Sequence, residues 1–169
     1  MNRNLRRRAV LAGLTVSTLM PNTAKAKAFV DLGWEDLIPK DQLSIPAALR
    51  SLLPHDETAP LISLQPASSG VRPDWNDRIV RIPGFIVPID YSGTGVTAFI
   101  LVPYVGACVH VPPPPANQLI FVTTTTPYEN EGLFEAVNVT GIFGVSSLTT
   151  HLADVGYALS ADNIEPYHS

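Results

Sequence analysis

Proline is the residue that most restricts how this chain folds. Sixteen of the 169 residues are proline, about twice the usual share, and they are spread through apolar runs. Because proline lacks an N–H donor and clashes with the preceding helical turn, long helices are disfavoured wherever it recurs. With 46% hydrophobic and only 15% charged residues, the chain still has enough apolar side chains for a packed core. The pattern predicts strands joined by fixed loops.

Five strand-like runs occupy the second half of the chain, and short helices are expected between or before them. The first run contains Pro83-Gly84, which predicts a bulge or a sharp bend. One helix is expected at 46–53, with proline at its first position, and another at 146–153. The runs are residues 78–90, 96–104, 119–125, 134–143 and 155–164.

This order of elements predicts a mainly β fold. A bent first strand followed by four more suits a five-stranded, partly open OB-like barrel with one or two short helices. A small β-sandwich is the alternative, because both architectures produce the same alternation of apolar and polar residues. We expect residues 29–77 to form an irregular lead-in segment with a short helix, and residues 78–169 to form the barrel.

Residues 1–28 have the pattern of an export signal. A basic start is followed by an apolar stretch at 9–20 that is too short to span a bilayer, and small residues at 26–28 suit cleavage. The pair Arg7-Arg8 before the apolar stretch fits twin-arginine export as well as the general secretory route. We therefore expect a periplasmic protein, cleaved near 26–28, with no transmembrane segment in the mature chain.

The charge changes sign after this leader. Downstream of Ala28 there are five basic and fifteen acidic residues, a net charge of −10. Such a charge repels phosphate backbones, which argues against nucleic acid as a partner. It is compatible with a cationic partner or a metal ion.

The most distinctive stretch runs from Pro103 to Gln118 and contains the only cysteine of the chain. Cys108 and His110 are two residues apart, which places both side chains on one face of an extended backbone. A thiolate and an imidazole can bind zinc or copper. Three interpretations stay open: a metal site, a cysteine packed as a small hydrophobic residue, and a thiol-dependent enzyme with the histidine as base.

Two ligands do not complete a zinc site, so further donors must come from elsewhere in the chain. No glycine-rich phosphate loop, H-E-x-x-H helix or G-x-S-x-G elbow is present, and the sequence indicates no enzyme class. We expect a non-enzymatic protein. The side chains that could supply the missing ligands are Glu35, Asp36, His55, Asp56, His151 and His168.

Three segments of the chain resemble the DUF3299 family of bacterial exported proteins. They are Trp34–Pro39, Val80–Ile89 and Phe99–Gln118, and the run Gly-Ala-Cys-x-His-x-Pro-Pro-Pro-Pro-x-Asn-Gln within the third is specific. The resemblance implies no established activity. It implies a periplasmic accessory role beside ABC-transporter components and zinc supply.

The leading expectation is therefore an accessory protein that binds zinc or copper, or that assists an ABC-type metal transport system or a periplasmic metal-binding protein. Cys108 and His110 would be ligands, completed by Glu35 or Asp36. One alternative is an interaction module that docks on a transporter through the proline-rich loop, with a buried, inert cysteine. Another is a cysteine-dependent thiol enzyme. The residues expected to orient the ligands or to shape the loop are Tyr104, Asn117 and Gln118.

Overall fold

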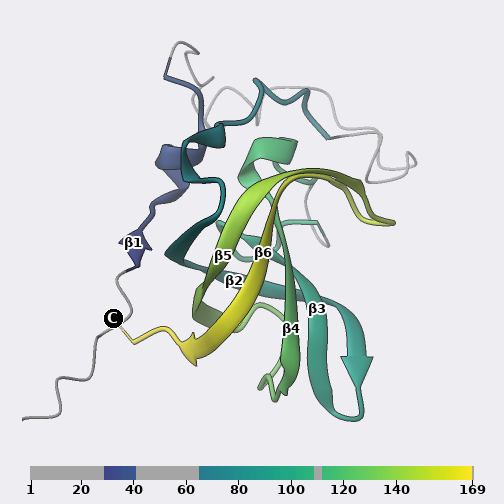
Figure 1. Cartoon of the computed structure of the whole chain (residues 1–169). Coiled ribbons are helices and arrows are strands. Elements are labelled where there is room, and N and C mark those ends of the chain that lie inside the picture. The colour runs from purple at the N-terminus through teal and green to yellow at the C-terminus, as the bar shows by residue number, and fades with distance from the viewer. Residues whose placement is uncertain (1–28, 41–64, 109–111, 169) are drawn as a thin grey trace, which may run out of the picture.

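The computed structural model describes residues 29–40, 65–108 and 112–168. The leader at 1–28 and the helix expected at 46–53 lie outside these residues. Six strands form one sheet, in which five close into a barrel (Figure 1). The strands are β1 (Val30–Asp31), β2 (Arg78–Ser92), β3 (Gly95–Val102), β4 (Ile120–Tyr128), β5 (Ala136–Thr149) and β6 (Asp154–Pro166).

The strand order identifies the barrel as OB-like. Neighbours follow the order β1-β2-β3-β4-β6-β5, and β2 pairs again with β5 to close the barrel. The β4–β6 pair is parallel, whereas the other pairs within the barrel are antiparallel. This is the five-stranded Greek-key arrangement of an OB barrel. The prediction of an OB-like barrel is confirmed, and a sandwich is excluded because the sheet closes on itself.

Strand β2 closes the barrel by changing its partner along its length. Residues 78–85 pair with β5, and residues 85–92 pair with β3, so Phe85 lies opposite both strands. Gly84 precedes this change of partner, and a Cβ there would lie 2.7 Å from the Leu101 side chain. The pairing with β5 runs through Pro83-Gly84 without a register shift, so the bulge expected there is wrong. The register shifts of β2 lie further along, between Pro88 and Tyr91.

The helix predicted at 146–153 is wrong. β5 continues to Thr149, and the next four residues form the turn into β6. Leu148 pairs with Val155 across the hairpin, and the Thr150 hydroxyl accepts hydrogen bonds from the backbone N–H of Leu152 and Ala153. Serine and threonine hydroxyls that bind nearby backbone groups favour such turns over helix. The helical elements of the described residues are short 3₁₀ turns: η1 (Trp34–Leu37), η3 (Pro73–Trp75) and η4 (Ala116–Gln118).

Apolar side chains form two cores, one inside the barrel and one on its outer surface. Alternate residues of β3 point to opposite sides, so Phe99 and Leu101 belong to the inner core, while Ile100 and Val102 belong to the outer one. The outer core also contains Val87, Ala107, Cys108, Leu119, Ala153 and Val155. A sheet with two buried faces explains why residues 98–102 of this strand are apolar at every position.

Hydrogen bonds attach the N-terminal turns to the barrel. The indole Nε1 of Trp34 donates to the Pro83 carbonyl (2.8 Å). The buried Tyr157 hydroxyl donates to the Leu37 carbonyl (2.8 Å) and accepts from the Arg72 backbone N–H (2.7 Å). These bonds hold η1 and the segment before η3 against the barrel.

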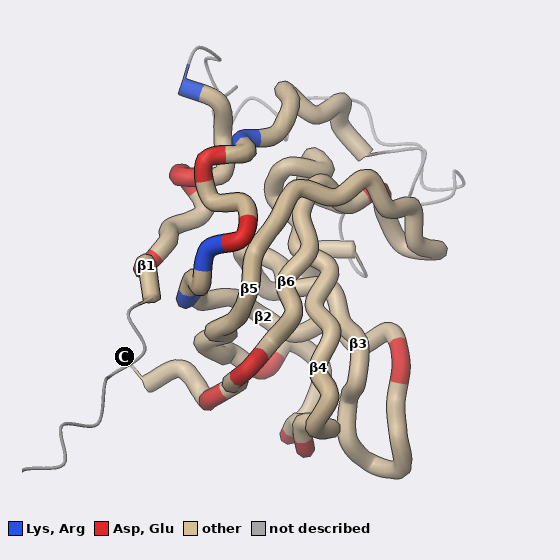
Figure 2. The backbone as a smooth tube through the Cα atoms, viewed as in Figure 1, with Lys and Arg blue, Asp and Glu red and all other residues tan. Residues whose placement is uncertain are grey.

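Charge is distributed unevenly over the described residues. Their four basic residues, Lys40, Arg72, Arg78 and Arg81, lie toward the side that carries β1 and η1, interspersed with carboxylates (Figure 2). The β4–β5 connection carries Glu129, Glu131 and Glu135 and no Lys or Arg, and Asp90 lies near the end of β2. Within the described part of the chain, no helix is long and apolar enough to cross a membrane.

Candidate functional site

Cys108 lies in the outer core, not at an open mouth of the barrel. Its side chain is 0% exposed and packs with aliphatic residues from β2, β3 and the end of the β5–β6 hairpin. Burial raises the pKa of the thiol from its ordinary value of 9.0 to about 12, because the charged thiolate is disfavoured in apolar surroundings. The burial therefore disfavours the thiolate, which is the reactive form of the side chain.

The proline run after Cys108 is mostly buried. The side chains of Pro113, Pro114 and Pro115 are buried, and Pro112 is half-buried. The Gln65 amide donates to the Pro114 carbonyl (2.9 Å) and to the Asp154 carbonyl (2.8 Å), which ties the run to the start of β6. The prolines of the expected docking loop thus pack against the protein and leave little of their own surface for a partner.

The loop between β3 and β4 covers a surface that other OB folds leave open. OB barrels bind oligonucleotides and oligosaccharides on the face of their second and third strands, which correspond to β3 and β4 here. In this chain Ala107 and Cys108 from the loop, and Ala153 and Val155 from the β5–β6 hairpin, pack in one cluster with Ile100 of β3. The chain therefore fills that face with its own side chains.

Within the described residues, the structure does not bring the expected metal ligands together. Glu35 is exposed on η1, and Asp36 accepts a hydrogen bond from the Gly33 backbone N–H (2.9 Å). His151, in the β5–β6 turn, and His168 are exposed. Within the described ranges, no group of three His, Cys, Asp or Glu side chains could hold a metal ion. His55, Asp56 and His110 lie outside the described residues.

Two of the three residues expected to shape the loop, Asn117 and Gln118, form hydrogen bonds that hold it in place. Asn117 is buried, and its amide donates to the Ser69 hydroxyl and the Gly70 carbonyl, both at 2.8 Å. The Gln118 amide donates to the Trp34 carbonyl (2.9 Å). Tyr104 lies at the other end of the loop, where it is 44% exposed. The two amides thus connect η4 to the N-terminal turns.

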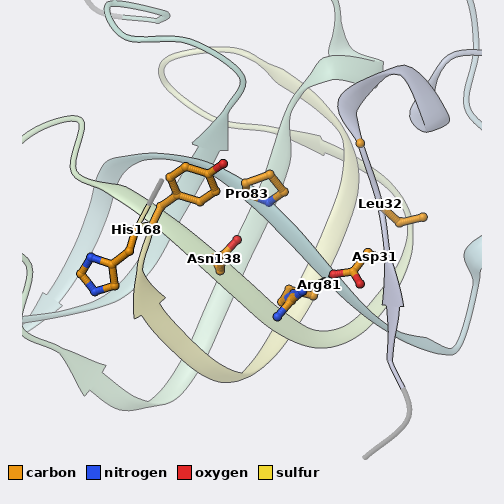
Figure 3. A pocket seen from close by; sticks show the side chains of 8 residues that line it. Asp31, Leu32, Arg81, Pro83, Asn138 and His168 are labelled. Atoms are coloured by element: carbon orange, nitrogen blue, oxygen red, sulfur yellow. Dashed lines mark hydrogen bonds and ion pairs between the residues drawn. The ribbon is translucent and has the colours of Figure 1, made fainter.

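A pocket of about 540 Å³ lies elsewhere, on the side of the barrel where β1 and the C-terminal residues meet (Figure 3). The Arg81 Nε donates to the Asp31 carboxylate at 2.7 Å. In the view of Figure 3, Asn138 lies between this ion pair and His168. The residues that line the pocket are Asp31, Leu32, Gly33, Arg81, Pro83, Asn138, Tyr167 and His168.

Sequence reasoning missed this pocket because no motif marks it. Arg81 and Pro83 alternate with buried residues in β2, which places them on the outer side of the barrel. Asn138 faces the same way in β5 because it is the cross-strand partner of Pro83. The register between these strands, which are distant in sequence, brings them together, and periodicity alone does not specify it.

Comparison with known proteins agrees with this architecture. The family model described as "Protein of unknown function (DUF3299)" matches residues 34–166. The chain belongs to the DUF3299 family. A crystal structure of a DUF3299 family protein from Pseudomonas aeruginosa PAO1 is 34% identical, with a TM-score of 0.71, and the alignment covers 84% of this chain and 98% of that one. No curated protein matches the sequence.

The DUF3299 match places the two candidate regions differently. The loop from Tyr104 to Gln118 lies wholly within the matched residues. The pocket combines matched residues of β2 and β5 with Asp31, Leu32, Gly33, Tyr167 and His168, which lie just outside the match. The loop therefore lies within the part of the chain that the family model matches.

Proposed function

We propose that this DUF3299 protein is a periplasmic accessory module that assists an ABC-type metal transport system by binding one of its protein components. The observation that carries the proposal is the form of the β3–β4 loop. Tyr104 and Val105 are 44% and 60% exposed, whereas the side chains that follow, Ala107 and Cys108, are anchored in the outer core. The loop thus exposes an aromatic and an aliphatic side chain, while the residues that follow them are held in the outer core.

A preformed loop of this kind suits protein recognition. Ordering a flexible loop on binding costs free energy, and a loop already held by its neighbours avoids that cost. Tyrosine is among the residues that contribute most to protein interfaces. In this proposal Cys108 and the prolines are structural, and the exposed tip of the loop contacts the partner.

Direct binding measurements test the proposal. The purified protein would be titrated with the transporter's substrate-binding component and, separately, with its permease in vesicles. We expect Tyr104→Ala to weaken binding to one of them at least tenfold. Tyr91→Ala is the matched control, because Tyr91 is 54% exposed on the β2–β3 hairpin. Equal affinity of both variants and the unaltered protein for each component would contradict the proposal.

Metal binding by Cys108 and His110 is the second candidate, and one observation favours it. Cys108 has a backbone φ of 66°, in the left-handed region that non-glycine residues rarely adopt, and such strain clusters at functional sites. Because the thiol pKa is raised to about 12, a metal would have to displace a tightly held proton, and binding would strengthen steeply with pH. Zinc and copper(I) titrations of Cys108→Ser and His110→Ala test this. If neither substitution weakens binding of either ion, the ligand assignment is wrong.

A further inference from the structure

We propose that the pocket between β1, β2, β5 and the C-terminal residues binds a neutral saccharide. The pocket shares no residue with the outer core around Cys108, so this inference is independent of the proposed docking function. Its volume of about 540 Å³ lies within the range of small-molecule sites. That size suits one or two sugar rings.

The charges of the pocket favour a ligand without net charge. Arg81 and Asp31 meet in an ion pair at 2.7 Å, with side chains 36% and 66% exposed. The guanidinium also lies 4.5 Å from the centre of the Phe29 ring, which stabilises a cation further. Because the positive charge is already balanced by a carboxylate, an anion gains little by entering the pocket.

The hydrogen-bonding groups match those of hydroxyls. A guanidinium offers only donors, a carboxylate only acceptors, and an amide both. Within the described residues, no hydrogen bond engages the Asn138 side chain, which lines the pocket. Sugar hydroxyls both donate and accept, so they can pair with all three groups at once.

The apolar groups of the pocket match the other face of a sugar ring. Pro83 and Tyr167 both line the pocket, and the tyrosine is 48% exposed. The tyrosine ring presents a flat apolar face beside its polar hydroxyl. A pyranose ring likewise combines an edge of hydroxyls with a face of C–H groups. It therefore fits a pocket lined by both polar and apolar side chains better than a purely polar metabolite would.

The walls of the pocket are held in position before a ligand binds. Strand β1 pairs in parallel with β2, and the Leu32 backbone N–H donates to the Arg81 carbonyl (2.9 Å). The C-terminal wall is fixed by the Tyr167 backbone N–H, which donates to the Ala136 carbonyl (2.8 Å). A preformed site loses less entropy on binding, which matters for a weakly bound sugar.

Titration followed by nuclear magnetic resonance tests the assignment. Isotope-labelled protein would be titrated with glucose and with N-acetylglucosamine, while the Asn138 side-chain amide and the Arg81 Nε–H signals are followed. We expect saturable shifts of both signals with at least one of the sugars. Glutamine and inorganic phosphate serve as zwitterionic and anionic comparisons. Shifts with either of these but with neither sugar would overturn the assignment, and so would no shift with any compound.

Variants separate specific binding from a general effect on the fold. Asn138→Ala removes a polar side chain from the pocket lining, and Tyr167→Ala removes an aromatic one. We expect each substitution to weaken sugar binding about tenfold. Tyr91→Ala, an exposed tyrosine outside the pocket, should leave affinity unchanged. Truncation after Pro166 should abolish binding while thermal stability is kept. Unchanged affinity in the two pocket variants would overturn the proposal.

Discussion

The buried thiol yields the sharpest prediction, because burial directly lowers the population of its reactive thiolate form. Burial of Cys108 raises the thiol pKa from 9.0 to about 12. At neutral pH this lowers the thiolate population about 1,000-fold relative to an exposed cysteine. The thiolate is the reactive form, and the side chain is 0% exposed, so native Cys108 should react with iodoacetamide at least about 1,000-fold more slowly than a free thiol.

The same shift predicts how stability changes with pH. Between 9.0 and about 12, the unfolded chain loses the thiol proton and the folded chain keeps it. Folding stability is therefore fully present below pH 9.0 and falls by about 1.4 kcal/mol per pH unit above it. Burial also raises the pKa of Tyr157, which acts in the same direction. The Cys108→Ala variant lacks the thiol contribution, so the difference between the two stability curves isolates it.

Labelling rates and urea unfolding across this pH range provide the measurements. Iodoacetamide should modify Cys108 of the native protein only as fast as the fold transiently opens and exposes the thiol. Once urea unfolds the protein, the modification should be rapid. Native-state labelling at the rate of a small thiol, with a midpoint near pH 9.0, would refute the reasoning. It would place the thiol in solvent and would restore Cys108 as a candidate nucleophile or accessible ligand.

Three substitutions test the packing of the barrel, each measured by urea unfolding. Gly141→Ala should destabilise by about 2 to 3 kcal/mol, because its Cβ would overlap the backbone of β6; an unchanged midpoint would mean that the strands separate easily. Tyr157→Phe should cost about 2 kcal/mol, since it leaves a buried carbonyl and a backbone N–H without their partner; a neutral effect would show that water replaces the hydroxyl. Asp31→Ala should cost less than about 1 kcal/mol, as its ion pair with Arg81 is exposed, and a larger loss would indicate a structural role for β1.

The strands of the barrel could be predicted because their signals are local. Alternation of apolar residues and the prolines that interrupt it located all five. The irregular point of β2 was not located, because its register shifts lie between Pro88 and Tyr91 and not at Pro83-Gly84. The end of β5 could not be predicted in this way. Residues 146–149 consist of serine and threonine beside one leucine. A short helix tolerates this pattern as well as a strand does. The cross-strand pairing of these residues with β6 favours the strand.

In the candidate site, too, some features follow from the sequence and others only from the tertiary structure. The spacing of Cys108 and His110 is a property of the chain, and so is the stiffness of the proline run. Burial of the cysteine is not, because it depends on Leu119, Val155 and other side chains that arrive from distant strands. The pocket beside Arg81 and Asn138 likewise exists only through strand register.

The amino-acid sequence by itself determined the approximate positions of the five barrel strands, the mainly β class and the resemblance to the DUF3299 family. Closure of the sheet into a barrel, which excludes a sandwich, was decided by the pairing of β2 with β5. Only the tertiary structure decided which side of each strand is covered, and by what. The physical reason is that backbone preference and alternation act between neighbours in the chain, whereas the burial of Cys108 and the pocket at Asn138 arise from side chains brought together by the closure of the barrel.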